Sequence, residues 1–135
     1  MPIPYEREIM RIAILFSLLA VQLLGCGSSQ QFPAVPPDLQ RESVPHQIID
    51  MTAEHFHFTP ELLHVKQGTF VTLHIKALDG THGFSLGAFG IDETIPEQET
   101  KTVEFFAGKK GEYGFKCSHF CGIGHLGMTG KVIVE

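Results

Sequence analysis

Two thiols, an imidazole and a thioether lie within twelve positions of one another near the end of this chain. They are Cys117, Cys121, His125 and Met128, in the segment KCSHFCGIGHLGM. Thiolate, imidazole and thioether are the soft ligands that select copper, and copper sites with a distant methionine sulfur transfer electrons. The upstream segment DGTHGFSL supplies a second imidazole, His82, at the start of a candidate strand. These residue types therefore predict a copper site.

Three other interpretations use the same residues. A disulfide is common in exported proteins, but a Cys117–Cys121 bridge would close a very small ring, remove little chain entropy and leave His125 and Met128 without a role. A structural zinc site would use four Cys or His ligands, and a thioether is a poor zinc ligand. The third is a mononuclear blue-copper site with Cys117 as a spare thiol, built from His82, Cys121, His125 and Met128.

The histidines outside these segments are expected at the surface, because an isolated histidine is more often exposed than a ligand. His55 and His57 alternate with two phenylalanines, which directs both imidazoles toward solvent if the segment is a strand. The histidines assigned to the surface are His46, His55, His57, His64 and His74.

From Ile48 onward the sequence predicts an all-β domain, because short runs with period-2 alternation are separated by Gly, Pro and Asp. In FVTLHIKAL, residues Val71, Leu73 and Ile75 fall on one face. KVIVE repeats the pattern, with its two valines pointing inward. Seven or so strands of this kind indicate a Greek-key β-sandwich or barrel with little helix. The other candidate strands cover residues 48–58, 61–66, 82–88, 101–107 and 112–117.

The residues before this domain predict export. RIAILFSLLAVQLLGC contains an apolar run of about fourteen residues, shorter than the roughly 20 that cross a bilayer, as in a signal peptide. Its end, LLGC, resembles the bacterial lipobox, so we expect residues 1–25 to be a lipoprotein signal peptide and Cys26 to be a lipid anchor. Met10 is the expected start, since the basic flank of the signal begins there. Residues 26–47 are rich in Ser, Gln and Pro and predict a flexible linker to the domain at 48–135.

The chain carries a net charge of −5, which argues against a nucleic-acid partner. Four acidic residues lie in IDETIPEQET, a predicted loop: Asp92, Glu93, Glu97 and Glu99. Such a loop is either a solvated surface or a patch that steers a basic electron donor toward the site.

The sequence resembles a known family over residues 48–135. EHFHFTPELLHVKQGTFVTLHI is similar to the first half of a cupredoxin. C-S-x-x-C-G-x-x-H-x-x-M after D-x-x-H-x-F resembles the CuA domain of cytochrome c oxidase subunit II, which nitrous oxide reductase shares. The resemblance implies a cupredoxin-like Greek-key fold and two copper ions per domain.

The resemblance also implies a role for each site residue. Cys117 and Cys121 would be thiolates that bridge the two copper ions, and both imidazoles would be terminal ligands. The Met128 thioether would be a weak ligand. The imidazoles are those of His82 and His125, and the remaining weak ligand would be the backbone carbonyl of His119.

As a function, the resemblance implies single-electron transfer at the extracytoplasmic face of a bacterial membrane, as subunit II of a haem-copper oxidase that accepts electrons from a cytochrome c-type donor. Oxygen reduction would belong to subunit I. Three departures weaken the oxidase assignment: His119 stands where oxidases have glutamate, the chain lacks tryptophan, and lipid on Cys26 would replace the usual transmembrane helix. A free-standing electron carrier or a copper-delivery protein is the alternative.

Overall fold

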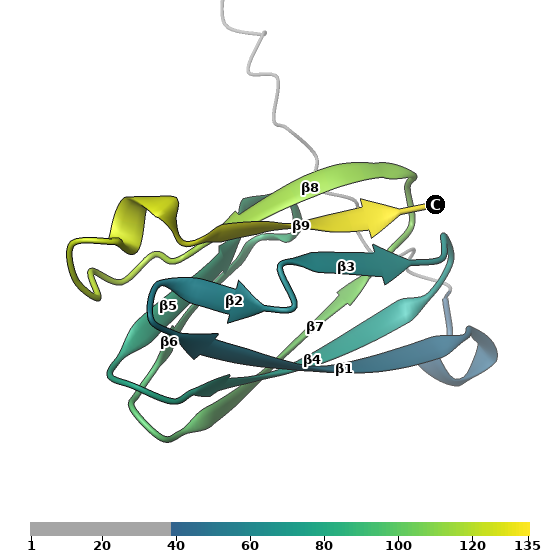
Figure 1. The fold of residues 1–135 in the computed structure, drawn as a ribbon. Coiled ribbons are helices and arrows are strands. Elements are labelled where there is room, and N and C mark those ends of the chain that lie inside the picture. Colours follow the sequence, from purple (N-terminus) through teal and green to yellow (C-terminus); the bar gives the residue numbers. More distant parts are fainter. Residues whose placement is uncertain (1–38) are drawn as a thin grey trace, which may run out of the picture. The chain divides into compact units, whose positions relative to one another are not determined.

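Two β-sheets pack face to face in the computed structural model, which describes residues 39–135 (Figure 1). The four-stranded sheet has the order β2 (His57–Thr59), β1 (His46–Glu54), β4 (Phe70–Ala77) and β7 (Thr100–Phe106). The five-stranded sheet has the order β3 (Leu62–Val65), β9 (Thr129–Val134), β8 (Gly111–Lys116), β5 (His82–Leu86) and β6 (Ile91–Ile95). In this part of the chain, helix is limited to the 3-10 turns η1 (Arg41–Ser43), η2 (Gly87–Phe89) and η3 (His125–Gly127).

The predicted all-β sandwich is confirmed, and alternation explains its core. Val71, Leu73 and Ile75 on β4 are all fully buried, as are the aromatic rings that the two sheets share. Phe58 packs edge-on against Phe84 and Phe115, with ring centroids 5.7 and 5.3 Å away. These contacts join β2 to β5 and β8, so the aromatic cluster ties the two sheets together.

The structure corrects the predicted strands in two places. The segment 48–58 is two antiparallel strands, β1 and β2, because the backbone turns through His55 and Phe56 at positive φ angles of 45° and 65°. IDETIPEQET is not a loop throughout: it begins with β6, which pairs with β5 at the edge of its sheet. Asp92 and Glu93 therefore lie on an exposed edge strand, where charged residues discourage pairing with other chains.

Two strand pairs are parallel, although the alternating pattern suggested antiparallel strands. β1 runs alongside β4, with His46 opposite Phe70 and Ala53 opposite Ala77, and β3 runs alongside β9. Alternation identifies the buried face of a strand but carries no information on its direction.

The parallel β1–β4 pair defines two poles of the domain. Both strands end near the segment that leads to His82, and both begin at the opposite pole. At that opposite pole, Arg41 forms an ion pair with Glu104 and lies over the Phe70 ring, 4.4 Å from its centroid. The C-terminus lies there too, since the Gln67 N–H donates to the Glu135 carbonyl over 2.9 Å (Figure 1).

The predictions for the N-terminal region concern residues outside the described part of the chain. They are the signal peptide, the lipid on Cys26 and the start at Met10, while the predicted linker overlaps the described residues from 39 to 47. β1 begins at His46, two positions before the predicted domain boundary. Within residues 39–135, no helix is both long and apolar enough to cross a bilayer.

Candidate metal centre

Three segments converge at the pole where β1 and β4 end. His82 opens β5, Cys117 follows the last residue of β8, and residues 117–128, which we call the cysteine loop, lead into β9. The two ends of this loop are tied together, because the Cys117 N–H donates to the Met128 carbonyl over 2.9 Å. β5 and β8 are neighbours in one sheet, so the sheet itself places the imidazole beside the thiols.

A glycine in β5 makes this approach possible. The cysteine loop crosses directly over Gly83, where an added Cβ would come within 2.8 Å of atoms of Ser118 and His119. The Gly83 N–H donates to Cys117 Sγ over 3.3 Å. A residue without a side chain is therefore required at this crossing.

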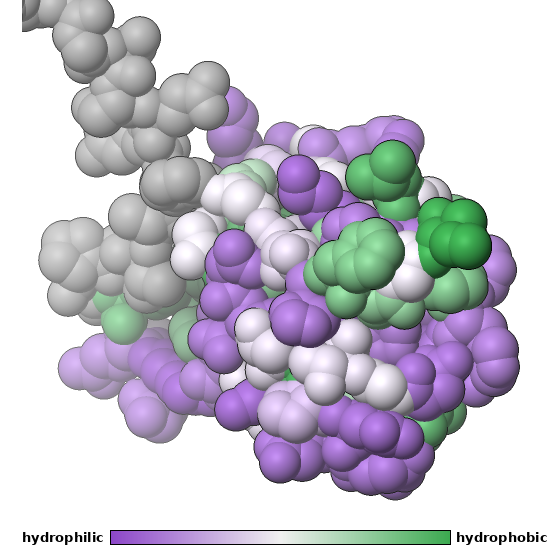
Figure 2. Space-filling view, turned by 90° about the vertical axis from the view of Figure 1, so that its left-hand side faces the viewer, coloured by the Kyte–Doolittle hydropathy of each residue, from purple (hydrophilic) through white to green (hydrophobic). Residues whose placement is uncertain are grey.

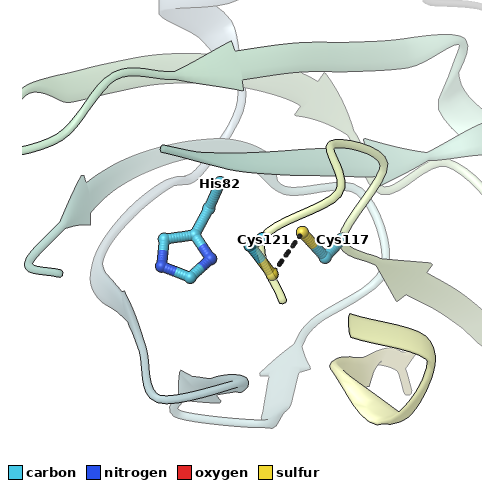
Figure 3. Close-up of side chains that lie close together, drawn as sticks. All are labelled: His82, Cys117 and Cys121. Carbon is cyan, nitrogen blue, oxygen red and sulfur yellow. Dashed lines mark hydrogen bonds between the residues drawn. The ribbon is translucent and has the colours of Figure 1, made fainter. Parts of the chain in front are cut away.

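One imidazole and two thiols form the centre of the site (Figure 3). Ligand atoms of His82, Cys117 and Cys121 all lie within 4.8 Å of one another. The two Sγ atoms are 3.6 Å apart, and both cysteines are free. A disulfide has its sulfurs about 2.05 Å apart, so the thiols contact each other without being bonded.

The His82 imidazole is buried and has one nitrogen without a partner. Its residue is 2% exposed, and Nε2 lies 2.9 Å from the Asp79 Oδ1. With Asp79 accepting the Nε2 proton, Nδ1 keeps its lone pair, and that atom is buried with no hydrogen-bond partner. Buried polar atoms normally have partners, so a free lone pair on this nitrogen suits it to bind a metal ion. Figure 3 shows the ring facing Cys121.

Asp79 stays ionised in this arrangement. Partial burial raises the pKa of Asp79, but hydrogen bonds with His82 and from the backbone N–H of His55 outweigh it, and the net pKa is lowered from 3.8. A metal-binding histidine almost always has such a carboxylate or carbonyl behind it, which fixes its tautomer.

The remaining predicted site residues surround the two thiols. Cys121 Sγ lies 3.8 Å from His125 Nδ1 and 3.9 Å from the Met128 Sδ. Cys117 Sγ donates to the His119 carbonyl over 3.0 Å. The structure thus places all six predicted site residues close together: His82, Cys117, His119, Cys121, His125 and Met128.

In the metal-free protein, burial makes the Cys121 thiol a weaker acid than an exposed cysteine. Desolvation first, then the hydrogen bond to Cys117 and the charge of that group, together raise the pKa of Cys121 from 9.0 to about 11. A soft cation would replace these protons, so metal binding here must release them.

Asp79 is the first residue of the D-x-x-H-x-F motif, but no role was predicted for it from the sequence. The signal was present, because a carboxylate three residues before a candidate ligand histidine can reach its ring nitrogen. A second contact had no such signal: the Ser118 hydroxyl donates to Asp92 Oδ1 and ties the cysteine loop to β6. The other predicted docking residues lie on β6, as Glu93, or in the turn after it, as Glu97 and Glu99.

Apolar side chains surround the outer side of the site. Phe120, Ile123 and Leu126 of the cysteine loop are 75%, 100% and 90% exposed. Figure 2 shows apolar side chains gathered on this pole. The Phe120 ring lies beside the half-buried His125, with centroids 5.7 Å apart. We call these three residues the apolar collar.

The donor set fits a soft metal. Two thiols, an imidazole nitrogen with a free lone pair and a thioether lie close together, and a soft thiolate and thioether pair selects copper over hard cations. His82, Cys117 and Met128 are 2%, 3% and 0% exposed. The other two side-chain donors, Cys121 and His125, are half-buried, and the His125 ring lies beside Phe120 of the collar.

Comparison with known proteins agrees with this geometry. A family model described as a cupredoxin-like domain matches residues 15–134. A cytochrome c oxidase subunit 2 of Thermus thermophilus is 31% identical over 80 residues, 59% of this chain and 59% of the relative. A nitrous-oxide reductase of Ralstonia nicotianae is 31% identical over 116 residues, 80% of this chain and 18% of the relative. The chain thus spans less than two thirds of the length of these curated relatives.

Solved structures show the same fold. The periplasmic domain of subunit II of the Bradyrhizobium japonicum cytochrome oxidase superposes with a TM-score of 0.60 at 19% identity, covering 65% of this chain and 83% of that domain.

Proposed function

The chain belongs to the family of cupredoxin-like domains, and from that premise we propose that it transfers single electrons through a copper centre. The observation that carries the proposal is the convergence of His82, Cys117 and Cys121, with a buried and unpartnered imidazole nitrogen among them. Copper, when bound, supplies a one-electron redox couple.

We further propose that the site holds two copper ions between the thiolates of Cys117 and Cys121. Support comes from two thiols in contact with each other and from two imidazoles close to them, His82 within the central cluster and His125 against Cys121. The Met128 sulfur and the His119 carbonyl also contact the thiols, at the distances given above, and would be weak ligands.

The chain's own contribution is to hold these donors still. The Gly83 N–H fixes the sulfur of Cys117, Asp79 fixes the ring of His82, and the first peptide of the cysteine loop is bonded to its last. Ligands held by a sheet move little when the charge of the centre changes, and little reorganisation favours fast electron transfer.

A mononuclear blue-copper site is the rival proposal. Cys121 contacts both His125 and Met128, and with His82 these residues could hold one copper ion. A zinc site stays possible for the same donors. Counting the metal bound per full-length chain, together with absorption and EPR spectra, separates these proposals.

The decisive experiment compares the wild type with Cys117→Ser. We expect two copper ions per wild-type chain, with an EPR hyperfine pattern from one electron shared by two nuclei, and loss of that pattern in the variant, since a hydroxyl does not bridge as a thiolate does. Met128→Leu should keep both ions and change the reduction potential. Unchanged copper content and spectrum in Cys117→Ser would refute the bridging role.

For partners, we propose a basic cytochrome c-type donor and, as acceptor, a haem-copper oxidase subunit I. The chain would then act as a subunit II. The apolar collar beside His125 and the acidic residues of β6 and its turn lie at the same pole as the thiols, which suits a partner with an apolar patch ringed by basic residues. A free-standing carrier or a copper-delivery protein would use the same site without subunit I.

We propose an extracytoplasmic location with a lipid anchor on Cys26, based on the LLGC segment. Cys26→Ser should move the full-length protein from the membrane fraction to the supernatant, as measured by immunoblot of a bacterial host lacking the partner subunit. Retention of the variant in the membrane would refute lipid as the only anchor.

A further inference from the structure

The turn between β1 and β2 is held in a conformation that its residues do not favour. His55 and Phe56 have φ angles of 45° and 65°, and residues other than glycine rarely keep such angles unless surrounding contacts enforce them. Here the His55 N–H donates to Asp79 Oδ2 over 2.8 Å, and Glu54 pairs with His57 across the turn. The turn is therefore fixed by the carboxylate that also holds His82.

This conformation places the Phe56 ring directly under the cysteine loop. A Cβ added at Gly124 would lie within 2.8 Å of three Phe56 atoms, and one added at Gly122 would lie 2.8 and 2.9 Å from two ring atoms. Both glycines belong to the segment that joins Cys121 to His125. No side chain separates this backbone from the ring.

The same turn thus contacts both halves of the site. Through Asp79 it supports the imidazole of His82, and through Phe56 it supports the segment that carries Cys121 and His125. We propose that Phe56 is a positioning residue, which fixes Cys121 and His125 relative to Cys117 and His82. This inference rests on the proposed function, since it concerns the geometry of the same site.

A purely structural role for Phe56 would be that of any half-buried ring against the core. Phe89 is such a ring: it is also half-buried, and it packs against Phe105 and Tyr113, with centroids 4.6 and 5.0 Å away. Phe89→Ala is therefore the matched control for Phe56→Ala.

The first test uses copper-free, full-length protein and the alkylation rate of each thiol, read by fragment mass spectrometry. Removing the ring frees the loop from its support, so we expect Phe56→Ala to speed iodoacetamide labelling of Cys121 on the order of tenfold through easier local opening. Phe89→Ala should leave that rate near the wild-type value. Equal rates in the two variants would overturn the proposal.

A second test does not require Phe56→Ala to fold well. Gly124 has a φ of −81°, which alanine adopts freely, so what opposes a methyl group there is the Phe56 side chain, through its ring and its Cβ. Gly124→Ala should disturb the site, while Gly127→Ala, in the same loop with nothing within 4 Å of the added Cβ, should not. We expect the copper-loaded Gly124→Ala protein to lose the wild-type hyperfine pattern.

Combining the two changes gives the sharpest result. For this test Phe56 is replaced by glycine, which removes both the ring and the Cβ that would lie 2.8 Å from the added methyl group, so the double variant should be closer to wild type in copper content and spectrum than Gly124→Ala alone. Additive damage would overturn the positioning role. Failure of the wild type to bind copper would instead refute the proposed function, and the alkylation test of Phe56 would still stand.

Discussion

Replacing Asp79 with asparagine tests how the buried imidazole is held. Both carboxylate oxygens of Asp79 face proton donors: Oδ1 lies 2.9 Å from the His82 Nε2 and Oδ2 lies 2.8 Å from the His55 N–H. An asparagine has only one oxygen. If that oxygen keeps the bond to His55, the amide NH₂ faces Nε2 and stabilises the tautomer with its proton on Nδ1, the atom that should bind metal.

The size of the effect follows from the exposure of the two partners. Losing the carboxylate behind a ligand histidine costs about 10- to 100-fold in metal affinity, or about 1.4 to 2.7 kcal/mol. The Asp79 side chain is 33% exposed and that of His82 only 2%. Water can replace part of the lost acceptor on the exposed side, so we expect the lower end, about tenfold.

Copper affinity is measured by competition with a chelator, and thermal unfolding of the copper-free variant reports any general damage. Asp50→Asn is the control, because it removes the same charge from an exposed position of β1, opposite His74. We expect the control to bind copper as the wild type does. An affinity of Asp79→Asn within about twofold of the wild type would refute the argument that Asp79 sets the tautomer.

Three further outcomes can be measured. Gly83→Ala should destabilise the domain by about 1–3 kcal/mol, as measured by calorimetry, because the added methyl group must push the cysteine loop away by roughly 0.7 Å or more. The control Gly114→Ala should leave the stability unchanged, because nothing lies within 4 Å of its added Cβ. The copper-free protein should lose stability between pH 9 and 11, because the pKa of Cys121 is raised in the folded state and the thiol therefore ionises at lower pH in the unfolded chain. A denaturation midpoint that stays the same across that range would contradict this prediction. Reduction by a basic cytochrome c, measured by stopped flow, should slow as salt shortens the Debye length from roughly 30 Å at 0.01 M to about 8 Å at 0.15 M. If the rate changes neither with salt nor when Glu97 and Glu99 are replaced by Gln, these residues do not steer the donor.

Strands with one buried face were predictable from the sequence, whereas β6, which is mostly exposed, was not. β4 alternates apolar and polar residues along its length because one side of it faces the core. β6 has Asp92, Glu93 and Thr94 exposed in succession and only Ile95 fully buried, so it carries no period-2 signal. The turn at His55 was equally hidden, because left-handed angles at two residues other than glycine are imposed by contacts made elsewhere.

The candidate ligands were predictable because five of the six lie in one short segment, residues 117–128. Of their supports, Asp79 carried a sequence signal, because it lies three residues before His82, but Phe56 did not. Phe56 lies far from Gly124 in the sequence, so their contact exists only once the sheets have packed. Residue type and spacing identify atoms that can bind metal, while the contacts that fix those atoms depend on tertiary structure.

Because the ends of the domain and the candidate metal centre lie at opposite poles, the protein can be attached to an electrode without covering the centre. Residues 39–45 and Glu135 lie at the pole where β1 and β4 begin, and the cysteine loop lies at the other (Figure 1). A linker or surface tag added at either end of this domain would therefore leave the apolar collar and His125 facing outward. Because both ends of the described domain lie at one pole, the domain also suits insertion into a longer polypeptide, so the candidate metal centre could be grafted into a host protein with the apolar collar open to solution.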